Sequence, residues 1–335
     1  MPTSGAISGC NRHWEPPRHR SRCASSKTNW SSPTTPMRHS GRPPGSGLAT
    51  RFSVSTSSRS QPWWTPCGRT SRRPMSQHGF AISRALTRGS GPVVLAGVGA
   101  AGAFTKSVNR VAIASLNRSR GVVHDLPGQT FQMLSDSVAY LKLSSVVAAN
   151  AASYIEQARR ASVLVIDIRN YPNEFMVFAL GGYLVGGATP FARFTVGDAS
   201  NPGAFGWTAT VSHTPRTPRY TGSVVILVDE VSQSQAEYTA MAFRVAPGAI
   251  VVGSTTAGAD GNVSRIPLPG GAEGMISGIG VFYPGGQPTQ RIGIVPDLVV
   301  HPTVAGIRAG RDEVLEAGVS RALGREFRLR SVSDR

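Results

Sequence analysis

The stretch VVILVDEVSQSQAEYTAMAFR, residues 224–244, contains the features that decide the fold of this chain. It begins with a continuous aliphatic run, which is typical of a strand buried on both faces of a parallel sheet. The run ends at Asp229, a short polar turn follows, and the apolar spacing from Ser234 onward predicts a helix over 234–246. A further apolar run at 249–253 predicts the next strand, so the segment forms a strand–helix–strand crossover.

Segments on either side extend this pattern. Residues 162–169, SVLVIDIR, predict a second buried strand, and the Ala-rich segment 148–160 predicts a helix that ends in two arginines. Other expected strands are at 108–116, 137–145 and 275–284, and other expected helices are at 174–185 and 311–323. We therefore predict one α/β domain, with a mostly parallel sheet and covering helices.

The first 90 residues differ from the rest. They contain 14 Lys and Arg but one acid, Glu15, and so account for +13 of the chain's net charge of +17. Their Ser-, Arg- and Pro-rich composition buries too little apolar surface to offset chain entropy, which predicts a disordered basic tail. Scattered tryptophans and cysteines leave a second interpretation open, a stretch translated out of frame. A real tail could bind nucleic acid or anionic lipid; for the folded domain we expect no nucleic acid.

The sequence predicts no disulfide or metal site in the folded part and no transmembrane helix. All three cysteines lie in the first 90 residues, so the folded part has no disulfide or Cys-ligated metal, and we expect no metal and no cofactor. No run of 18 apolar residues predicts a transmembrane helix, and the first 30 residues lack the apolar core of a signal peptide. Residues 91–104 allow two interpretations, a strand with a Gly-rich turn or the apolar region of a signal peptide that starts at Met75.

The turn before helix 234–246 contains candidate catalytic residues. The backbone N–H groups at a helix start are unpaired, so the Gln235 N–H is a candidate donor to an oxyanion beside Ser234. Glu237 lies three residues after Ser234 and shares its helix face. A structural alternative is that Ser232 or Ser234 caps the helix and Glu237 closes a capping box. The local sequence leaves both interpretations open.

The order of four segments resembles the tail-specific, or C-terminal processing, peptidases and the related tricorn core protease. These segments are VAYLKLSS, VLVIDIRNYPN, YTGSVVILVDEVSQSQAEYTAMAFR and the stretch from AIVVGSTTAGADG to GRDEVLEAGV, within 130–324. The resemblance implies a ClpP/crotonase-like fold, a serine endopeptidase that cleaves unfolded polypeptides, and an exported, periplasmic or secreted location. It assigns Ser234 as nucleophile, Glu237 as supporting acid and the Gln235 N–H as oxyanion donor.

The resemblance also implies substrate contacts. A second oxyanion donor is expected from the turn after strand 162–169, where Pro172 has no N–H and Asn173 or Tyr171 must serve. Gly258, in the turn that follows strand 249–253, is expected to bind substrate. The partner implied is a polypeptide, and the oligomeric state is left open.

This chain departs from the family at the general base. Processing peptidases use a Lys in a GKG turn, but here the turn reads AGADG, with Ala259 and Asp260 at that place. The tricorn-like branch uses a His in an Asp-Gly-His motif, which this chain lacks. We interpret the three histidines after residue 90 as surface residues: His124, His213 and His301. Gln290 stands where the tricorn-like branch has an acid.

These observations predict four regions. Residues 1–90 are the tail, 91–129 a linker or remnant of a PDZ-like domain, 130–325 the catalytic domain and 326–335 a flexible C-terminus. Two functions follow. The first is a serine endopeptidase with Ser234 as nucleophile and no base at the expected positions. The alternative is a non-catalytic, truncated relative that binds extended peptides.

Overall fold

The computed structural model describes residues 53–55, 91–99, 101–112, 115 and 124–329. Most of the predicted tail, and residues 330–335, lie outside this part. Within it, β1 (Ser53–Ser55) pairs with β2 (Val93–Gly99), which forms an antiparallel hairpin with β3 (Gly102–Val108). The segment 91–104 thus forms a strand and turn, although little of β2 beyond Val93 is buried. None of the described helices is long and apolar enough to cross a membrane.

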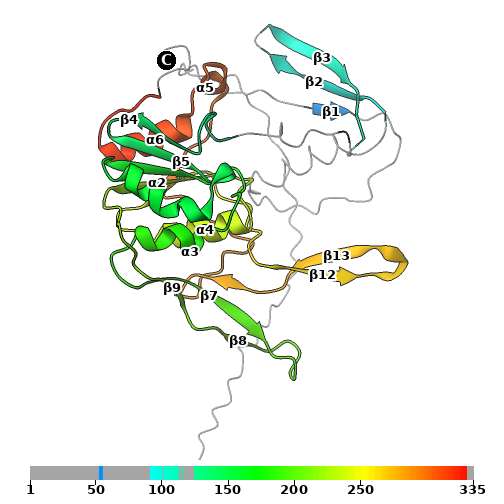
Figure 1. The fold of residues 1–335 in the computed structure, drawn as a ribbon. Coiled ribbons are helices and arrows are strands. Elements are labelled where there is room, and N and C mark those ends of the chain that lie inside the picture. Colours follow the sequence, from blue (N-terminus) through cyan, green and yellow to red (C-terminus); the bar gives the residue numbers. More distant parts are fainter. Residues whose placement is uncertain (1–52, 56–90, 100, 113–114, 116–123, 330–335) are drawn as a thin grey trace, which may run out of the picture. The chain divides into compact units, whose positions relative to one another are not determined.

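The main sheet has six strands in the order β15-β11-β10-β6-β5-β4. Figure 1 shows β4 and β5 side by side near α2 and α6. Only β4 (Phe131–Ser135) is antiparallel to its neighbour, whereas the other five strands run parallel. Their bounds are β5 Val138–Lys142, β6 Val163–Asp167, β10 Ser223–Val228, β11 Ile250–Gly253 and β15 Leu298–Val299. The predicted α/β class with a mostly parallel sheet is therefore confirmed, including the parallel crossover from β10 to β11.

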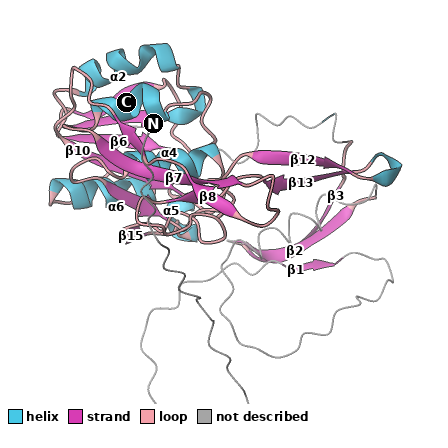
Figure 2. Ribbon diagram, turned by 90° about the horizontal axis from the view of Figure 1, so that it is seen from below, coloured by secondary structure: helices cyan, strands magenta, loops and turns pink. Residues whose placement is uncertain are grey.

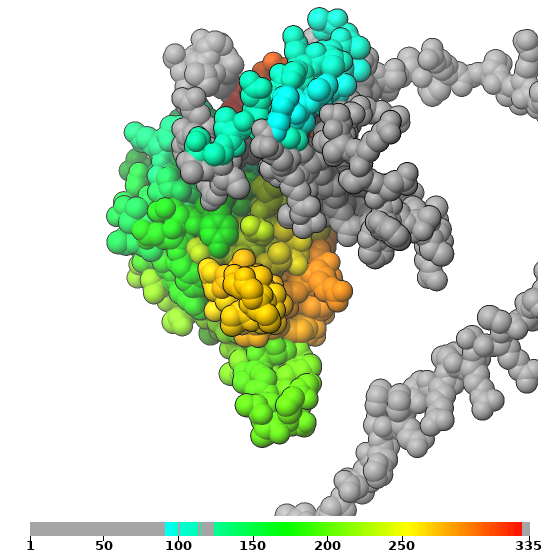
Figure 3. All heavy atoms as spheres, turned by 90° about the vertical axis from the view of Figure 1, so that its right-hand side faces the viewer, coloured from blue at the N-terminus to red at the C-terminus, as the bar shows by residue number. Residues whose placement is uncertain are grey.

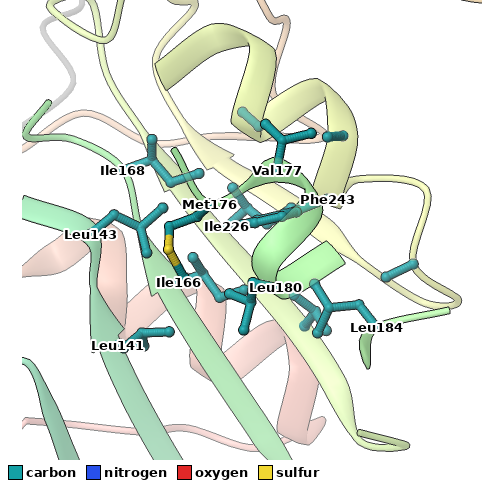
Figure 4. Packing of buried hydrophobic residues seen from close by; sticks show 14 of the residues in the cluster. Leu141, Leu143, Ile166, Ile168, Met176, Val177, Leu180, Leu184, Ile226 and Phe243 are labelled. Atoms are coloured by element: carbon teal, nitrogen blue, oxygen red, sulfur yellow. The ribbon is translucent and has the colours of Figure 1, made fainter. Parts of the chain in front are cut away.

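Helices cover both faces of this sheet (Figure 2). One face packs against α2 (Ala151–Ala158), α3 (Val177–Leu180) and α4 (Gln235–Phe243), and the other against α6 (Glu313–Leu323). Alternate residues of β10 enter the two cores: Ile226 lies on the α4 face and Leu227 on the α6 face. Figure 4 shows Ile226 and Phe243 packed with residues of β5, β6 and α3. This two-sided burial explains the continuous apolar runs in the sequence.

Two smaller sheets complete the domain. β7 (Thr189–Gly197) pairs with β8 (Phe205–Trp207), β9 (Val211–His213) and β14 (Val281–Phe282). β12 (Val263–Pro267) and β13 (Glu273–Ser277) form a two-stranded ribbon. In Figure 3 this ribbon and the β8 end of the second sheet form separate projections. The short helix α5 (Val304–Arg308) precedes α6.

Some predicted elements differ from the structure. The expected strand 275–284 is interrupted, since β13 ends at Ser277 and pairs with β12, whereas β14 begins at Val281 and pairs with β7. The helix expected over 174–185 is reduced to α3 and the 3₁₀ turn Gly181–Tyr183. The strand expected over 108–116 is wrong, since the described residues 109–112 are not in a strand.

The last described residues pack on α6. Phe327 joins the apolar cluster under that helix, and the Leu329 N–H donates to Glu316 (3.2 Å). At the start of α6, Arg169 donates to both Asp167 and Asp312, each at 2.6 Å. These buried ion pairs join the end of β6 to the start of α6.

Candidate active site

Ser234 lies in the turn between β10 and α4, at the carboxyl edge of the parallel strands. Its φ of 54° and ψ of −119° are unusual for a residue with a side chain. Such a conformation costs on the order of 1–3 kcal/mol and persists only where the surroundings impose it. A strained strand-to-helix turn of this kind presents a serine hydroxyl at the edge of an α/β sheet.

The preceding residues anchor the turn to the sheet. The buried Ser232 hydroxyl donates to the Ile168 carbonyl (3.1 Å), at the end of β6. The N–H groups of Val231 and Ser232 both donate to Asp229 Oδ1 (3.1 Å each). Ser232 therefore has a structural role in the turn, and the chain enters α4 from a fixed position.

Glu237 is the second anchor of the turn, and its side chain is fully buried. Its carboxylate accepts four hydrogen bonds, from the N–H groups of Ser234 (3.1 Å), Gly258 (2.7 Å) and Ala259 (2.9 Å) and from the Thr256 hydroxyl (2.5 Å). The Ser234 side chain faces the Glu237 N–H, so the capping box is also present. Glu237 thus joins the start of α4 to the turn after β11.

Gln235 begins α4, so its N–H lacks the intrahelical acceptor that later residues have. The Gln235 side chain donates to the Glu174 carbonyl (2.9 Å), which ties the helix start to the turn after β6. The structure therefore brings together the two turns from which oxyanion donors are expected.

Asn173 is placed differently from the expectation. Its N–H donates to the Leu143 carbonyl (2.8 Å) and its side-chain amide donates to the Val146 carbonyl (3.1 Å). Both donors hold the turn against the segment after β5, so in this conformation the Asn173 N–H is not free for a substrate. The neighbouring Pro172 has no N–H to offer.

Gly258 lies between Glu237 and a second loop. Its N–H donates to Glu237, and its carbonyl accepts a hydrogen bond from the Arg291 N–H (2.7 Å). Its φ is +67°, and a Cβ there would lie 3.0 Å from the backbone carbon of Arg291. Glycine is therefore required by both conformation and space.

No histidine or lysine of the described residues makes a hydrogen bond with Ser234. Lys142, on β5, donates to the Leu126 carbonyl (3.0 Å). Asp260 follows the turn held by Glu237 and is buried, with the Gly261 N–H as a donor to its carboxyl (2.7 Å). Burial, and secondarily the charge of Glu237, raise the pKa of Asp260 to about 7.

The prediction that the histidines lie on the surface is only partly correct. His301 is exposed. His213 is buried against the Phe191 ring (4.4 Å between centroids), with Nε2 at 2.9 Å from the Ala242 carbonyl, so its interpretation as a surface residue is wrong. Burial lowers the pKa of His213. The spacing of a polar, Pro-rich segment gave no sign that α4 would cover it.

His124 was also interpreted as a surface residue, but it is only partly exposed and is bonded through Nδ1 to the Asp229 carboxylate. This hydrogen bond raises the pKa of His124. The pair lies in a cleft of about 520 Å³ that also contains Arg169 and Val314, on the α6 side of the sheet. Nothing in the local sequence predicts the pair, because its members are 105 residues apart.

The described part of the chain contains no group of three or more His, Cys, Asp and Glu side chains arranged for metal binding. Gln290, at the place of an acid in the tricorn-like branch, donates to the carbonyls of Asp260 (3.0 Å) and Ile279 (2.7 Å). It thus holds the loop that carries Arg291.

Comparison with known proteins adds to this geometry. The sequence model of Peptidase family S41 matches residues 137–300. Among solved structures, one described as a peptidase from Parabacteroides merdae ATCC 43184 is 22% identical, with a TM-score of 0.53, over 58% of this chain and 64% of that one. Mature CPAF in complex with lactacystin is 12% identical, with a TM-score of 0.55, over 72% and 71%. No curated protein sequence matches the chain.

A third similar structure is the photosystem II D1 C-terminal processing protease, which is 19% identical, with a TM-score of 0.44, over 73% of this chain and 63% of that one. The chain covers less than two thirds of the length of the P. merdae and photosystem II proteins. The two structures with TM-scores above 0.5 show the fold. The match of residues 137–300 to the sequence model of Peptidase family S41 confirms the resemblance inferred from the sequence, and over these residues the chain is similar to that family.

Proposed function

We propose that the domain is a serine-type endopeptidase that cleaves unfolded polypeptides, with Ser234 as the nucleophile. The observation that carries the proposal is the strained Ser234 backbone, held at a helix start by the buried Glu237. This arrangement supports a hydroxyl that is presented at the sheet edge beside an unpaired N–H, the kind of group that stabilises an oxyanion.

In the proposed reaction, Ser234 Oγ attacks the peptide carbonyl and forms an ester bond, and the carbon–nitrogen bond breaks. The hydroxyl proton passes through a base to the leaving amine, and water then hydrolyses the ester. The Gln235 N–H stabilises the oxyanion, and Glu237 acts as a positioning residue because all four of its hydrogen bonds go to the protein. We further propose that the substrate contacts the turn that carries Gly258.

The second candidate is a relative that binds extended peptides without cleaving them. One observation favours it: in the described part of the chain, Ser234 makes no hydrogen bond with a histidine or lysine. A serine hydroxyl without a base is a poor nucleophile near neutral pH.

One experiment separates the two functions. The full chain is treated with a fluorophosphonate probe and, separately, with reduced and carboxymethylated casein. For the peptidase we expect labelling and cleavage, both lost by about 10³-fold or more in Ser234→Ala and retained in the control Ser153→Ala, on the exposed face of α2. Unlabelled wild-type protein that binds casein without cutting it would establish the second candidate instead.

A further inference from the structure

A groove of about 400 Å³ lies beside Gly258, at the base of the β12–β13 ribbon. It is lined by Gly258, the segment 277–280, Gln290 and Arg291. Gly278 and Gly280 contribute only main chain to it, and a Cβ on either would meet a side chain of the protein, Ser264 or Phe282. The half-exposed Ile279 adds an apolar wall (37% exposed).

Arg291 supplies the charge of this groove. Of the described residues that line it, Arg291 alone is ionisable. Its guanidinium makes no hydrogen bond or ion pair within the described part of the chain. By contrast, the Gln290 amide is already engaged with three backbone groups, of Asp260, Ile279 and Val281. The Ser277 hydroxyl likewise donates to the Asp260 carbonyl (3.1 Å). The groove is thus positively charged, and its other two polar side chains are committed to the protein.

The backbone of Arg291 is also unusual. Its φ is 68°, a left-handed conformation that glycine adopts without strain and that costs a longer side chain about 1 kcal/mol. The Arg291 N–H donates to the Gly258 carbonyl (2.7 Å), which fixes the residue at the edge of the groove. A strained residue whose long side chain has no partner among the described residues points, at such a place, to a use for that side chain.

We propose that Arg291 binds a carboxylate of the polypeptide that occupies this groove, either an acidic side chain or a C-terminal carboxylate. The planar guanidinium matches a carboxylate with two parallel hydrogen bonds, which makes this ligand favourable over an uncharged one. The inference rests on the proposed function for its polypeptide ligand. It adds a preference for a carboxylate at a loop whose backbone is joined to the Ser234 turn through Gly258 and Glu237.

The test uses the full chain with Ser234→Ala, so that no peptide is consumed, and measures binding by fluorescence anisotropy. Three fluorescein-labelled peptides of one apolar sequence are compared: one with an internal Glu and an amidated end, one with Gln and a free C-terminal carboxylate, and one with Gln and an amidated end. We expect Arg291→Gln to weaken binding of at least one carboxylate peptide about 10-fold and to leave the uncharged peptide unchanged. The affected peptide identifies the carboxylate source.

Two variants serve as controls. Arg291→Lys keeps the charge without the planar fork and should fall between wild type and Arg291→Gln. Arg159→Gln removes an equal charge from α2 and should leave all three affinities unchanged. Equal weakening of all peptides by Arg291→Gln, the same loss in Arg159→Gln, or no binding of any peptide would overturn the inference.

These outcomes are separable from those of the proposed function. Probe labelling of Ser234 without carboxylate-selective binding would leave the peptidase in place and refute the role of Arg291. Carboxylate-selective binding in a chain that is never labelled would support Arg291 and the non-catalytic function together.

Discussion

Ser234 and Arg291 are two non-glycine residues of the described chain with a left-handed backbone, and they are held in different ways. The turn at Ser234 is fixed by Glu237, whose buried carboxylate accepts four hydrogen bonds. The turn at Arg291 is fixed by backbone contacts with Gly258, and by the nearby Gly293, which has a φ of +81°. One turn depends on a buried charge, and the other on glycines and main-chain hydrogen bonds.

Thr256 and Gly258 connect the two turns. The Thr256 hydroxyl donates to Glu237 (2.5 Å) and accepts from the Ile294 N–H (2.7 Å). The backbone conformation of Ser234 is therefore imposed by buried groups, and its relaxation requires the loss of their hydrogen bonds. Arg291 lies on the surface, so its backbone conformation can relax at little cost in free energy. Each of the following changes tests this difference.

The largest effect is expected for Glu237→Ala. It leaves three N–H groups and one hydroxyl without their acceptor, so the free energy of unfolding should fall by about 4–5 kcal/mol. Urea unfolding followed by circular dichroism measures the change. Glu273→Ala, which removes an exposed partner of Arg265, should cost about 0.5 kcal/mol or less. Similar losses in both variants would contradict the central role of the Glu237 carboxylate.

Asp260→Asn should stabilise the protein at neutral and alkaline pH. The carboxyl ionises near its ordinary pKa of 3.8 in the unfolded chain but near 7 in the native state, so wild-type stability falls as pH rises from about 4 to 7. Removal of the charge should then add about 2–4 kcal/mol at pH 8 and little at pH 4. Unfolding free energies at the two pH values measure this, and a gain that is equal at both would refute the buried charge as its cause.

Gly258→Ala should cost about 2–3 kcal/mol, because the new Cβ meets both an unfavourable φ and the Arg291 backbone. The matched control is Gly248→Ala, where φ is +69° but no atom lies within 4 Å of the added Cβ. This control should cost about 1 kcal/mol. The difference between the two variants measures the crowding between the turns, and equal costs would show that the connection through Gly258 is loose.

The smallest effect has the opposite sign. Arg291→Gly should raise stability by about 0.5–1 kcal/mol because glycine relieves the left-handed strain. Arg291→Ala keeps a Cβ and should show no such gain. Differential scanning calorimetry of the two variants tests this, and destabilisation by Arg291→Gly would mean that the arginine side chain itself supports the fold.

Much of the fold could be predicted from residue patterns. The continuous apolar runs at 162–169 and 224–229 correspond to β6 and β10, because a strand buried on both faces has no polar side in its sequence. The placement of Ser234 and Glu237 on one helix face also follows from helical spacing. The interruption of the strand expected over 275–284 could not be predicted, because its two parts pair with different strands, β12 and β7.

The candidate site was predictable only in part. Gln235 and Gly258 could be placed beside Ser234 by resemblance, but the engagement of the Asn173 N–H by Leu143 could not. The raised pKa of Asp260 depends on neighbours from other elements, which no spacing in the sequence reveals.

The sequence alone was sufficient to predict the buried strands β6, β10 and β11, helix α4 and the position of the serine turn, since these depend on local periodicity and on backbone groups within a few residues. The hydrogen bonds that Glu237 accepts, the burial of His213 under α4 and the joining of the Ser234 and Arg291 turns by Gly258 followed only from the tertiary structure. The physical reason is that burial and hydrogen-bond partners come from segments far apart in the chain. They arise only when the sheet brings the carboxyl ends of its strands together.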